Sequence, residues 1–301
     1  MIGYKGRVGV IGATSIIGKC LLPLLVEQGW DVVAFSRQAQ YVKEQAENQQ
    51  ITWQLLTKSK LSGGGNIQQS EKPINYWISL APIAVLYEHF AMLLAHGARH
   101  VVAISSTIRF TKSESSDKEE KKMANNLAEG EKRLIAWAKR ENLTFTILRP
   151  TLVYDPGHDK NVSAIASFIR RFYFFPVFGE ACGLRQPVHA QDVALCCVAA
   201  LDSAAAINKS YNISGEEIIS YREMINRVFT ALNKREHVII FPLWLFRLAI
   251  LFLRIFPPFK KWSASMAERM NRDLIFGHED ASRDLGFKPR PFNLTNQFHR
   301  H

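Results

Sequence analysis

The sequence predicts an α/β fold in which helices cover both faces of a doubly wound parallel sheet. Two observations predict it: apolar runs of strand length alternate with helical patterns through the first two hundred residues, and a glycine-rich turn follows the first run. The 301 residues, 47% of them hydrophobic, also supply a sizeable core. The expected strands are residues 6–11, 31–36, 51–56, 74–80, 100–106 and 144–149, and the expected helices are 16–28, 38–48, 84–96 and 123–141.

The first helix has a clear end, because Gly29 is suited to a C-terminal cap, and Pro23 is expected to kink it. After Arg149-Pro150 the regular alternation fades. We therefore expect a Rossmann domain over residues 1–157, with a return segment at 188–215. A smaller, mainly helical C-terminal substrate lobe is then assembled from residues 158–187 and 216–301.

The net charge of +11 lies mostly towards the C-terminus, because residues 222–301 hold 14 Lys and Arg against 7 Asp and Glu. No aromatic-basic RNA motif or recognition-helix pattern accompanies this charge, which disfavours nucleic acid and favours anionic small molecules or a membrane surface. A solvated basic surface is the alternative. The cysteines form no CxxC pair, so we expect neither a disulfide framework nor a metal site, and a reducing, cytoplasmic location; they are Cys20, Cys182, Cys196 and Cys197. A peripheral location at the membrane is the alternative, and it depends on the apolar segment at residues 243–256.

The glycine-rich turn has the context of a dinucleotide site, since it directly follows a strand and opens a helix. Gly12 would form the tight turn and Gly18 would allow close helix–strand packing. Ser15 occupies the middle position, where it could also cap the helix. A turn kept for packing alone is the alternative. The predicted cofactor-binding residues of the turn are Gly12, Thr14, Ser15, Ile16, Ile17 and Gly18.

A second signal lies about twenty residues past the turn, where Ser36-Arg37 ends the second strand. An acidic residue at this place would bind the ribose 2′-hydroxyl of NAD, whereas a cation suits a 2′-phosphate. We therefore predict that Ser36 and Arg37 bind the cofactor and that NADP(H) is preferred over NAD(H). In the alternative, Arg37 is only a surface arginine.

Seven stretches in this order, VIGATSIIG, WISLAP, VVAISST, TILRPTLVYDPG, PVHAQDVA, YNISGEE and LGFKPRPF, resemble the extended and atypical short-chain dehydrogenase/reductase superfamily. Within it, the chain is most similar to nucleoside-diphosphate-sugar epimerase/dehydratase-like proteins. The resemblance implies that Leu80, Ala81 and Pro82 line the cofactor. It also implies that Ser105 and Pro150 lie at the nicotinamide, and that a hydroxyl after the fifth strand orients the substrate oxygen, with Thr107 nearest that position and Ser106 its neighbour.

The same family uses a Tyr-x-x-x-Lys pair on the next helix for proton transfer, and this pair is missing here. Aligning Glu131 with the family glutamate downstream of the pair puts Met123 and Leu127 at the two positions. No tyrosine occurs between Tyr87 and Tyr154, so no other alignment restores the pair. The remaining proton-transfer candidates are Lys121, Lys122, Glu129, Glu131 and Tyr154, all of which are expected to be solvated or structural.

In the second lobe, Arg185 matches a family position that meets a substrate phosphate, and Asn161 could reach the substrate or close a turn. Asp192 is expected to cap the helix 193–201, and His189 to be a packed or locally bonded histidine.

Residues 243–256 predict one apolar helix of 14 residues, about 21 Å long and therefore too short to cross a membrane. Arg247 and Arg254 share one face of it. Such a helix could lie in a membrane interface, or pack against the core or against a second copy of the chain in a homodimer.

These features predict an NADP(H)-binding atypical short-chain dehydrogenase/reductase that acts as an oxidoreductase or a sugar epimerase. Its substrate would be anionic, a nucleotide- or lipid-linked sugar. The alternative is a non-catalytic protein that binds the cofactor, either a sensor or a membrane-associated assembly protein.

Overall fold

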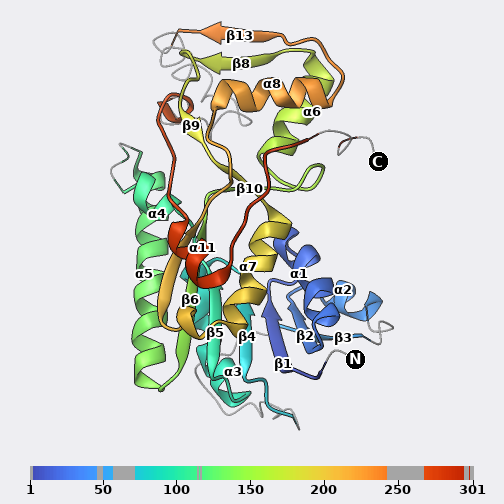
Figure 1. Cartoon of the computed structure of the whole chain (residues 1–301), viewed down its shortest axis with the longest axis vertical. Coiled ribbons are helices and arrows are strands. Elements are labelled where there is room, and N and C mark those ends of the chain that lie inside the picture. Colours follow the sequence, from blue (N-terminus) through green and yellow to red (C-terminus); the bar gives the residue numbers. More distant parts are fainter. Residues whose placement is uncertain are drawn as a thin grey trace.

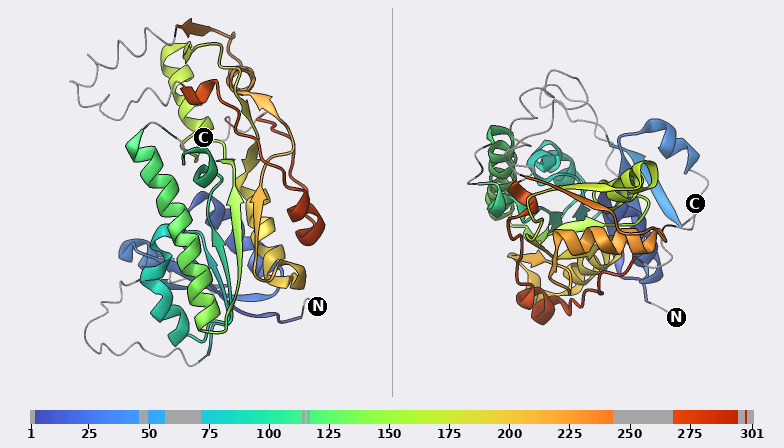
Figure 2. Two further views of the ribbon diagram at one scale, coloured as in Figure 1. Left: turned by 90° about the vertical axis from the view of Figure 1, so that its left-hand side faces the viewer. Right: turned by 90° about the horizontal axis from the view of Figure 1, so that it is seen from above.

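The computed structural model describes residues 3–45, 50–56, 72–113, 115, 117–242, 268–294 and 298. It is an elongated molecule, with a sheet domain at one end and a smaller lobe at the other (Figure 1). Figure 2 shows the same two parts from the side, with helix α5 (Lys118–Arg140) running along the sheet domain.

A parallel sheet of seven strands in the order β11-β6-β5-β4-β1-β2-β3 forms the sheet domain, which confirms the predicted fold class. Val10 pairs with Ala34 on one side and with Ile78 on the other. The predicted strands are all present, and β11 is added to them at the sheet edge. The strands are β1 (Gly6–Ile11), β2 (Trp30–Ser36), β3 (Ile51–Leu55), β4 (Tyr76–Ser79), β5 (His100–Ile104), β6 (Thr144–Pro150) and β11 (Lys209–Ile213).

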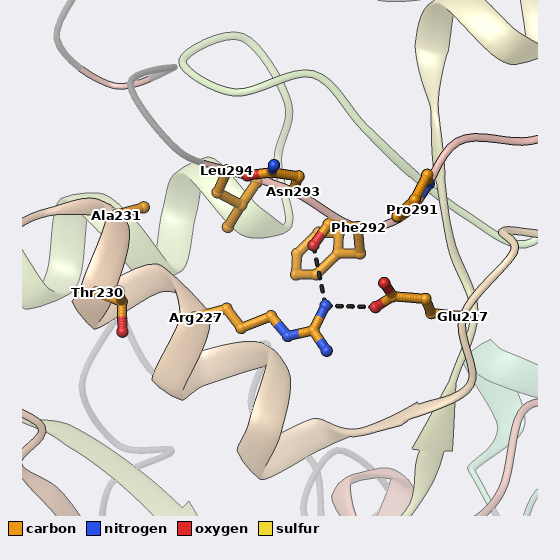
Figure 3. Close-up of a pocket in the computed structure, with 8 residues that line it drawn as sticks. All are labelled: Glu217, Arg227, Thr230, Ala231, Pro291, Phe292, Asn293 and Leu294. Carbon is orange, nitrogen blue, oxygen red and sulfur yellow. Dashed lines mark hydrogen bonds and ion pairs between the residues drawn. The ribbon is translucent and has the colours of Figure 1, made fainter.

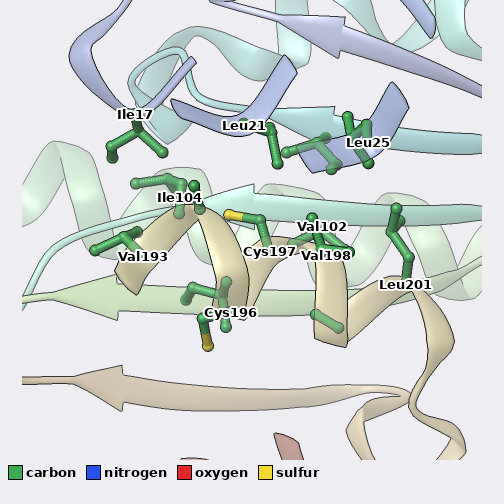
Figure 4. Close-up of a cluster of buried hydrophobic side chains, with 14 of the residues drawn as sticks. Ile17, Leu21, Leu25, Val102, Ile104, Val193, Cys196, Cys197, Val198 and Leu201 are labelled. Atoms are coloured by element: carbon green, nitrogen blue, oxygen red, sulfur yellow. The ribbon is translucent and has the colours of Figure 1, made fainter. Parts of the chain in front are cut away.

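Helices cover both faces of this sheet. On one face, α1 (Ile16–Glu27) packs against α7 (Ala190–Asp202), and Figure 4 shows Leu21 and Leu25 of α1 above Cys197 and Val198 of α7. The opposite face is covered by the 3-10 helix η1 (Ile83–His89), α3 (Phe90–Ala95) and α5 (Lys118–Arg140).

Three predicted helices differ from those observed. The helix expected at 84–96 is divided into η1 and α3. Only α2 (Ala39–Glu44) is described within the helix expected at 38–48. Helix α5 begins five residues before its predicted start, because the Asp117 carboxylate accepts the amides of Glu119 and Glu120 as an N-cap.

In the part of the lobe that the structure describes, two helices pack with three small two-stranded sheets. The helices α6 (Val162–Phe172) and α8 (Tyr221–Ala231) enclose a core that includes Tyr154, Phe229 and Phe292. The strand pairs are β7 (Leu152–Tyr154) with β10 (Pro187–His189), β9 (Leu184–Arg185) with β12 (Ile219–Ser220), and β8 (Phe175–Phe178) with β13 (Val238–Phe241).

Near its end the chain returns to the sheet domain. Helix α11 (Glu279–Leu285) lies against β11 and α7 (Figure 1). Ala281, Leu285 and Phe287 join the hydrophobic core beneath α1 and α7.

None of the helices within the described ranges is both long enough and apolar enough to span a membrane. The helix predicted at 243–256 lies outside the described residues, so its packing and its membrane contact stay predictions.

Candidate cofactor and substrate site

The turn between β1 and α1 leaves no room for a side chain at Gly12. Its φ is +78°, and a Cβ there would lie 2.9 Å from the Ala81 amide nitrogen. The end of β4 is held against the turn because the Leu80 amide donates to the Ile11 carbonyl at 2.8 Å. Gly12 therefore allows both the turn and its close contact with Leu80-Ala81.

Ser15 caps α1, because its Oγ accepts the Gly18 amide at 3.1 Å. Gly18 is packed so tightly that a Cβ would lie 2.2 Å from the Ala13 carbonyl oxygen. The serine thus supports the helix N-terminus, whose positive end attracts a phosphate. Thr14, Ile16 and Ile17 lie in the same turn and the first turn of α1.

A buried polar atom lies next to this turn. Ser79, in register with Ile11, is 1% exposed, and its hydroxyl has no hydrogen-bond partner within the described residues. A ligand or water is expected beside such a hydroxyl. The glycine turn, the helix N-terminus and Ser79 together fit a bound dinucleotide.

Ser36 and Arg37 lie at the end of β2. The buried Ser36 Oγ accepts the Gln38 amide at 3.1 Å, whereas Arg37 is exposed. Their roles in binding the cofactor stay predictions, as do those of Leu80, Ala81 and Pro82 beyond β4.

The three hydroxyls after β5 each have a local partner. Ser105 Oγ donates to the Glu131 carboxylate at 2.6 Å, and Ser106 Oγ accepts the Ile108 amide at 3.2 Å. Thr107 donates to the Pro150 carbonyl from its amide at 3.2 Å and from its hydroxyl at 3.3 Å. The structure therefore brings Thr107 and Pro150 together at the ends of neighbouring strands.

Glu131 is held by an ionic network that the sequence analysis missed. Glu131 is 1% exposed, and its carboxylate accepts hydrogen bonds from the Arg149 guanidinium at 2.7 and 3.0 Å. It also pairs with Arg109 and accepts the Ser105 hydroxyl. Both guanidinium groups lie near the Phe110 ring, 5.0 and 5.4 Å from its centroid. Glu131 thereby fastens α5 to the ends of β5 and β6.

The positions assigned to the missing pair lie on α5. Met123 is 48% exposed, and Leu127 is partly buried against the core beneath α5. Lys121 and Lys122 are exposed, and Glu129 pairs with Arg133 at the surface. The alignment that assigns these positions stays a prediction.

The side-chain amine of Lys112 lies next to Met123. Lys112 was not among the candidate residues that the sequence predicts. It follows the one-turn helix α4 (Ile108–Thr111), and its Nζ lies 3.9 Å from Met123 Sδ and 3.4 Å from a Glu120 carboxylate oxygen. Burial and the Arg269 guanidinium lower the pKa of Lys112 to about 8. No local sequence pattern indicates this arrangement of Lys112 and Glu120. Arg269, which also pairs with Glu120, is more than a hundred residues away in the sequence.

Arg185 is 4% exposed and is surrounded by backbone carbonyls. Its guanidinium donates to the carbonyls of Leu184 and Arg272 at 2.7 Å and to that of Arg269. In this arrangement it anchors the chain at 269–272 to the lobe. Phosphate binding by Arg185 stays a prediction. To bind a phosphate, the guanidinium would have to give up some of its hydrogen bonds to these carbonyls.

Asn161 is exposed before α6, and its Nδ2 donates weakly to the Val153 carbonyl at 3.4 Å. The neighbouring Asp159 carboxylate instead accepts the amides of Asn161 and Ser163. A role for Asn161 in substrate binding stays a prediction.

The prediction that Asp192 caps α7 is wrong. His189 is the N-cap, and its Nδ1 accepts the Gln191 amide at 3.1 Å. Asp192 lies one turn further and accepts the amide and guanidinium of Arg290 at 3.0 and 2.9 Å. Its partner comes from a distant segment that the spacing could not reveal.

Tyr154 is fully buried between His189 and Phe292, with ring centroids 5.1 and 4.9 Å away. Burial raises the pKa of its phenol further above the neutral range. This environment suits a packing role rather than proton transfer at neutral pH.

A cavity of about 310 Å³ lies in the lobe, and none of the predicted site residues lines it. Arg227 crosses it to pair with Glu217 and to donate to the Phe292 carbonyl at 3.0 Å (Figure 3). No cluster of three or more metal-binding side chains occurs in the described part of the chain.

Residues 90–214 match the model of the NAD dependent epimerase/dehydratase family. UDP-glucose 4-epimerase of Vibrio cholerae is 26% identical over 171 residues, covering 57% of this chain and 49% of that protein. A mitochondrial protein of Arabidopsis thaliana, NADH dehydrogenase [ubiquinone] 1 alpha subcomplex subunit 9, is 27% identical over 90 residues, covering 30% of this chain and 22% of that protein. The chain thus aligns with about half or less of these relatives.

Solved structures share the fold over nearly the whole chain. UDP-glucose 4-epimerase from Thermotoga maritima with UDP-glucose matches with a TM-score of 0.66 and 16% identity, covering 98% of both chains. UDP-glucuronic acid 4-epimerase from Bacillus cereus with NAD matches with a TM-score of 0.68 and 16% identity, covering 97% of this chain and 94% of the other. The predicted resemblance to epimerase/dehydratase-like proteins is confirmed by the family model over residues 90–214 and, for nearly the whole chain, by the fold that it shares with the solved epimerases.

The Glu131 network predicts a large loss of stability in Glu131→Gln. The amide keeps the shape of the side chain but leaves Arg109 and Arg149 without their counter-charge, which should cost about 3 kcal/mol. Urea unfolding measures this change. Glu129→Gln, which removes a surface ion pair on the same helix, is the control and should leave the free energy of unfolding nearly unchanged. Equal losses in the two variants would contradict the network's role.

Proposed function

We propose that this chain is an NAD(P)-dependent enzyme that epimerises, or oxidises and reduces, a sugar carried on a nucleotide or lipid diphosphate. The observation that carries the proposal is the contact of Thr107 with Pro150 at adjacent strand ends. The glycine turn follows β1, and the carboxyl ends of these parallel strands lie along the same edge of the sheet. A cofactor on the turn could therefore reach Thr107.

The chain's own residues have distinct tasks in this proposal. The turn from Gly12 to Gly18 holds the pyrophosphate, and Arg37 favours the 2′-phosphate of NADP(H), with NAD(H) as the alternative cofactor. The bound nicotinamide supplies hydride transfer. Thr107, with Ser106 beside it, orients the substrate oxygen. Arg185 and Asn161 are the proposed contacts to the anionic part of the substrate.

Lys112 is the proposed proton-transfer group. Its amine contacts Met123, at the place assigned to the missing tyrosine, and its pKa of about 8 leaves both protonation states populated near neutrality. The same amine can therefore accept a proton in one reaction direction and return it in the other.

A second function, a sensor or assembly protein that binds the cofactor without turnover, is favoured by Met123 and Leu127, which transfer no proton. One curated relative is named as a subunit of NADH dehydrogenase, which is compatible with this alternative. The two functions differ in whether a bound cofactor is consumed.

Purified protein should reduce NADP+ or interconvert sugar epimers when it is supplied with UDP-glucose or UDP-glucuronic acid, because the hydroxyl-bearing carbons of both sugars can give a hydride to the oxidised cofactor. Absorbance of the reduced cofactor and chromatography of the sugars measure the two reactions. Tight NADPH binding without turnover of either UDP-sugar would instead support the sensor.

Arg37→Ala should weaken NADP(H) binding by about tenfold to a hundredfold, because it removes a charged partner of the 2′-phosphate. NAD(H) binding should change little. Calorimetric titration of wild type and variant with both cofactors measures the preference. Equal affinities for NADP and NAD in both proteins would refute a role for Arg37 in cofactor choice.

Lys112→Met should lower turnover by about a hundredfold or more, the usual contribution of an acid–base group, while the Kd for NADPH is retained. In wild type, the oxidative rate should rise as pH increases through about 8, because only the neutral amine accepts a proton. The reductive rate needs the ammonium form and should fall over the same range. Lys121→Met is the control, and its turnover and pH profile should match those of wild type. Full activity in Lys112→Met would exclude Lys112 as the proton carrier.

A further inference from the structure

The corner where α6 meets β8 exposes an unusual set of aromatic side chains. Phe172 is 46% exposed and Tyr173 is 66% exposed. Phe168, Phe172 and Phe174 form a continuous ring cluster, with centroids 4.6 Å apart for the first pair and 6.3 Å for the second. Scattered apolar side chains are normal on a surface, whereas a contiguous group marks an interaction site.

The backbone at Tyr173 adds a second observation. Tyr173 is the C-cap of α6, with φ at +64°, a left-handed conformation in which glycine is preferred and a bulky residue is unfavourable. Glycine at this position would adopt the same backbone conformation without the steric cost that a side chain adds. A side chain kept exposed at an energetic cost points to a contact outside the fold.

Cations surround these rings. Arg171 lies 5.5 Å from the Phe172 ring centroid, and Lys234 Nζ lies 3.6 Å from that of Tyr173. The two stretches that form the corner, residues 168–175 and 232–238, contain one acid, Glu236, against four basic residues. The four are Arg170, Arg171, Lys234 and Arg235.

The corner lies at the end of the molecule away from the sheet domain (Figure 1). Next to it, β13 pairs with β8 and presents Ile240, which is 49% exposed. An exposed aliphatic side chain suits the acyl boundary of a bilayer, whereas single-stranded nucleic acid needs free aromatic faces for its bases. The face of Tyr173 is already covered by Lys234.

We propose that this aromatic-basic corner docks the protein on an anionic membrane surface. Phe172 and Tyr173 enter the headgroup region, where aromatic rings are favoured, and Arg171, Lys234 and Arg235 meet lipid phosphates. The proposal concerns a surface distinct from the cofactor turn and does not depend on the proposed reaction.

Flotation of the full chain with vesicles tests the proposal. The protein should float at low salt with equal parts of phosphatidylcholine and phosphatidylglycerol, and should float poorly with phosphatidylcholine alone. Joint replacement Phe172→Ser with Tyr173→Ser should weaken binding about tenfold or more. Arg171→Gln with Arg235→Gln should weaken it about fivefold per cation, because each cation near such a surface contributes about 1 kcal/mol.

The matched control combines Ile207→Ser with Arg140→Gln, since both residues are exposed in the sheet domain. It should bind vesicles as wild type does, and all variants should share the thermal midpoint of wild type. Every protein in the series keeps residues 243–267 unchanged, so a loss of binding reports on the corner. The proposal is overturned if the corner variants float like wild type, if neutral vesicles bind equally well, or if the protein binds an oligonucleotide but no vesicle.

Discussion

A single buried carboxylate, that of Glu131, fixes the part of the molecule on which a reaction would depend. It joins Arg109, Arg149 and Ser105, which come from α4, β6 and the end of β5. Without it, two guanidinium groups would face each other across the strand ends that carry Thr107 and Pro150. The position of the Thr107 hydroxyl therefore depends on an ion network that does not itself touch the turn.

The two halves of the candidate site are built by different forces. In the half that contains the glycine turn, close backbone packing sets the geometry of the turn. Gly12 and Gly18 lie so near the backbone atoms of other residues that no side chain would fit at either position. At the substrate half, charge sets the geometry, through Glu131 and through Glu120 with Lys112 and Arg269. Steric fit is encoded in a short stretch of sequence, whereas the charged half is assembled from distant ones.

This difference explains what could be predicted from the sequence. Strands β1 to β6 and the glycine turn have local signals, so their positions were predicted to within two residues. Strand β11 escaped prediction because its residues, KSYNI, are mostly polar at a sheet edge. Lys112 and the partner of Asp192 also escaped, since Arg269 and Arg290 meet them only in the folded chain. The anchoring of Arg185 by carbonyls has the same origin.

The position of helix α11 determines how the molecule is expected to unfold. The chain leaves the sheet domain to build the lobe, then returns to place Ala281, Leu285 and Phe287 in the core beneath α1 and α7. It then enters the lobe again, where Phe292 and Leu294 are buried. The two parts are thus interlaced rather than joined in series, and neither core is complete until the last segment is in place. Such a chain should melt as one cooperative unit, and no cut within it would release an independently folded lobe.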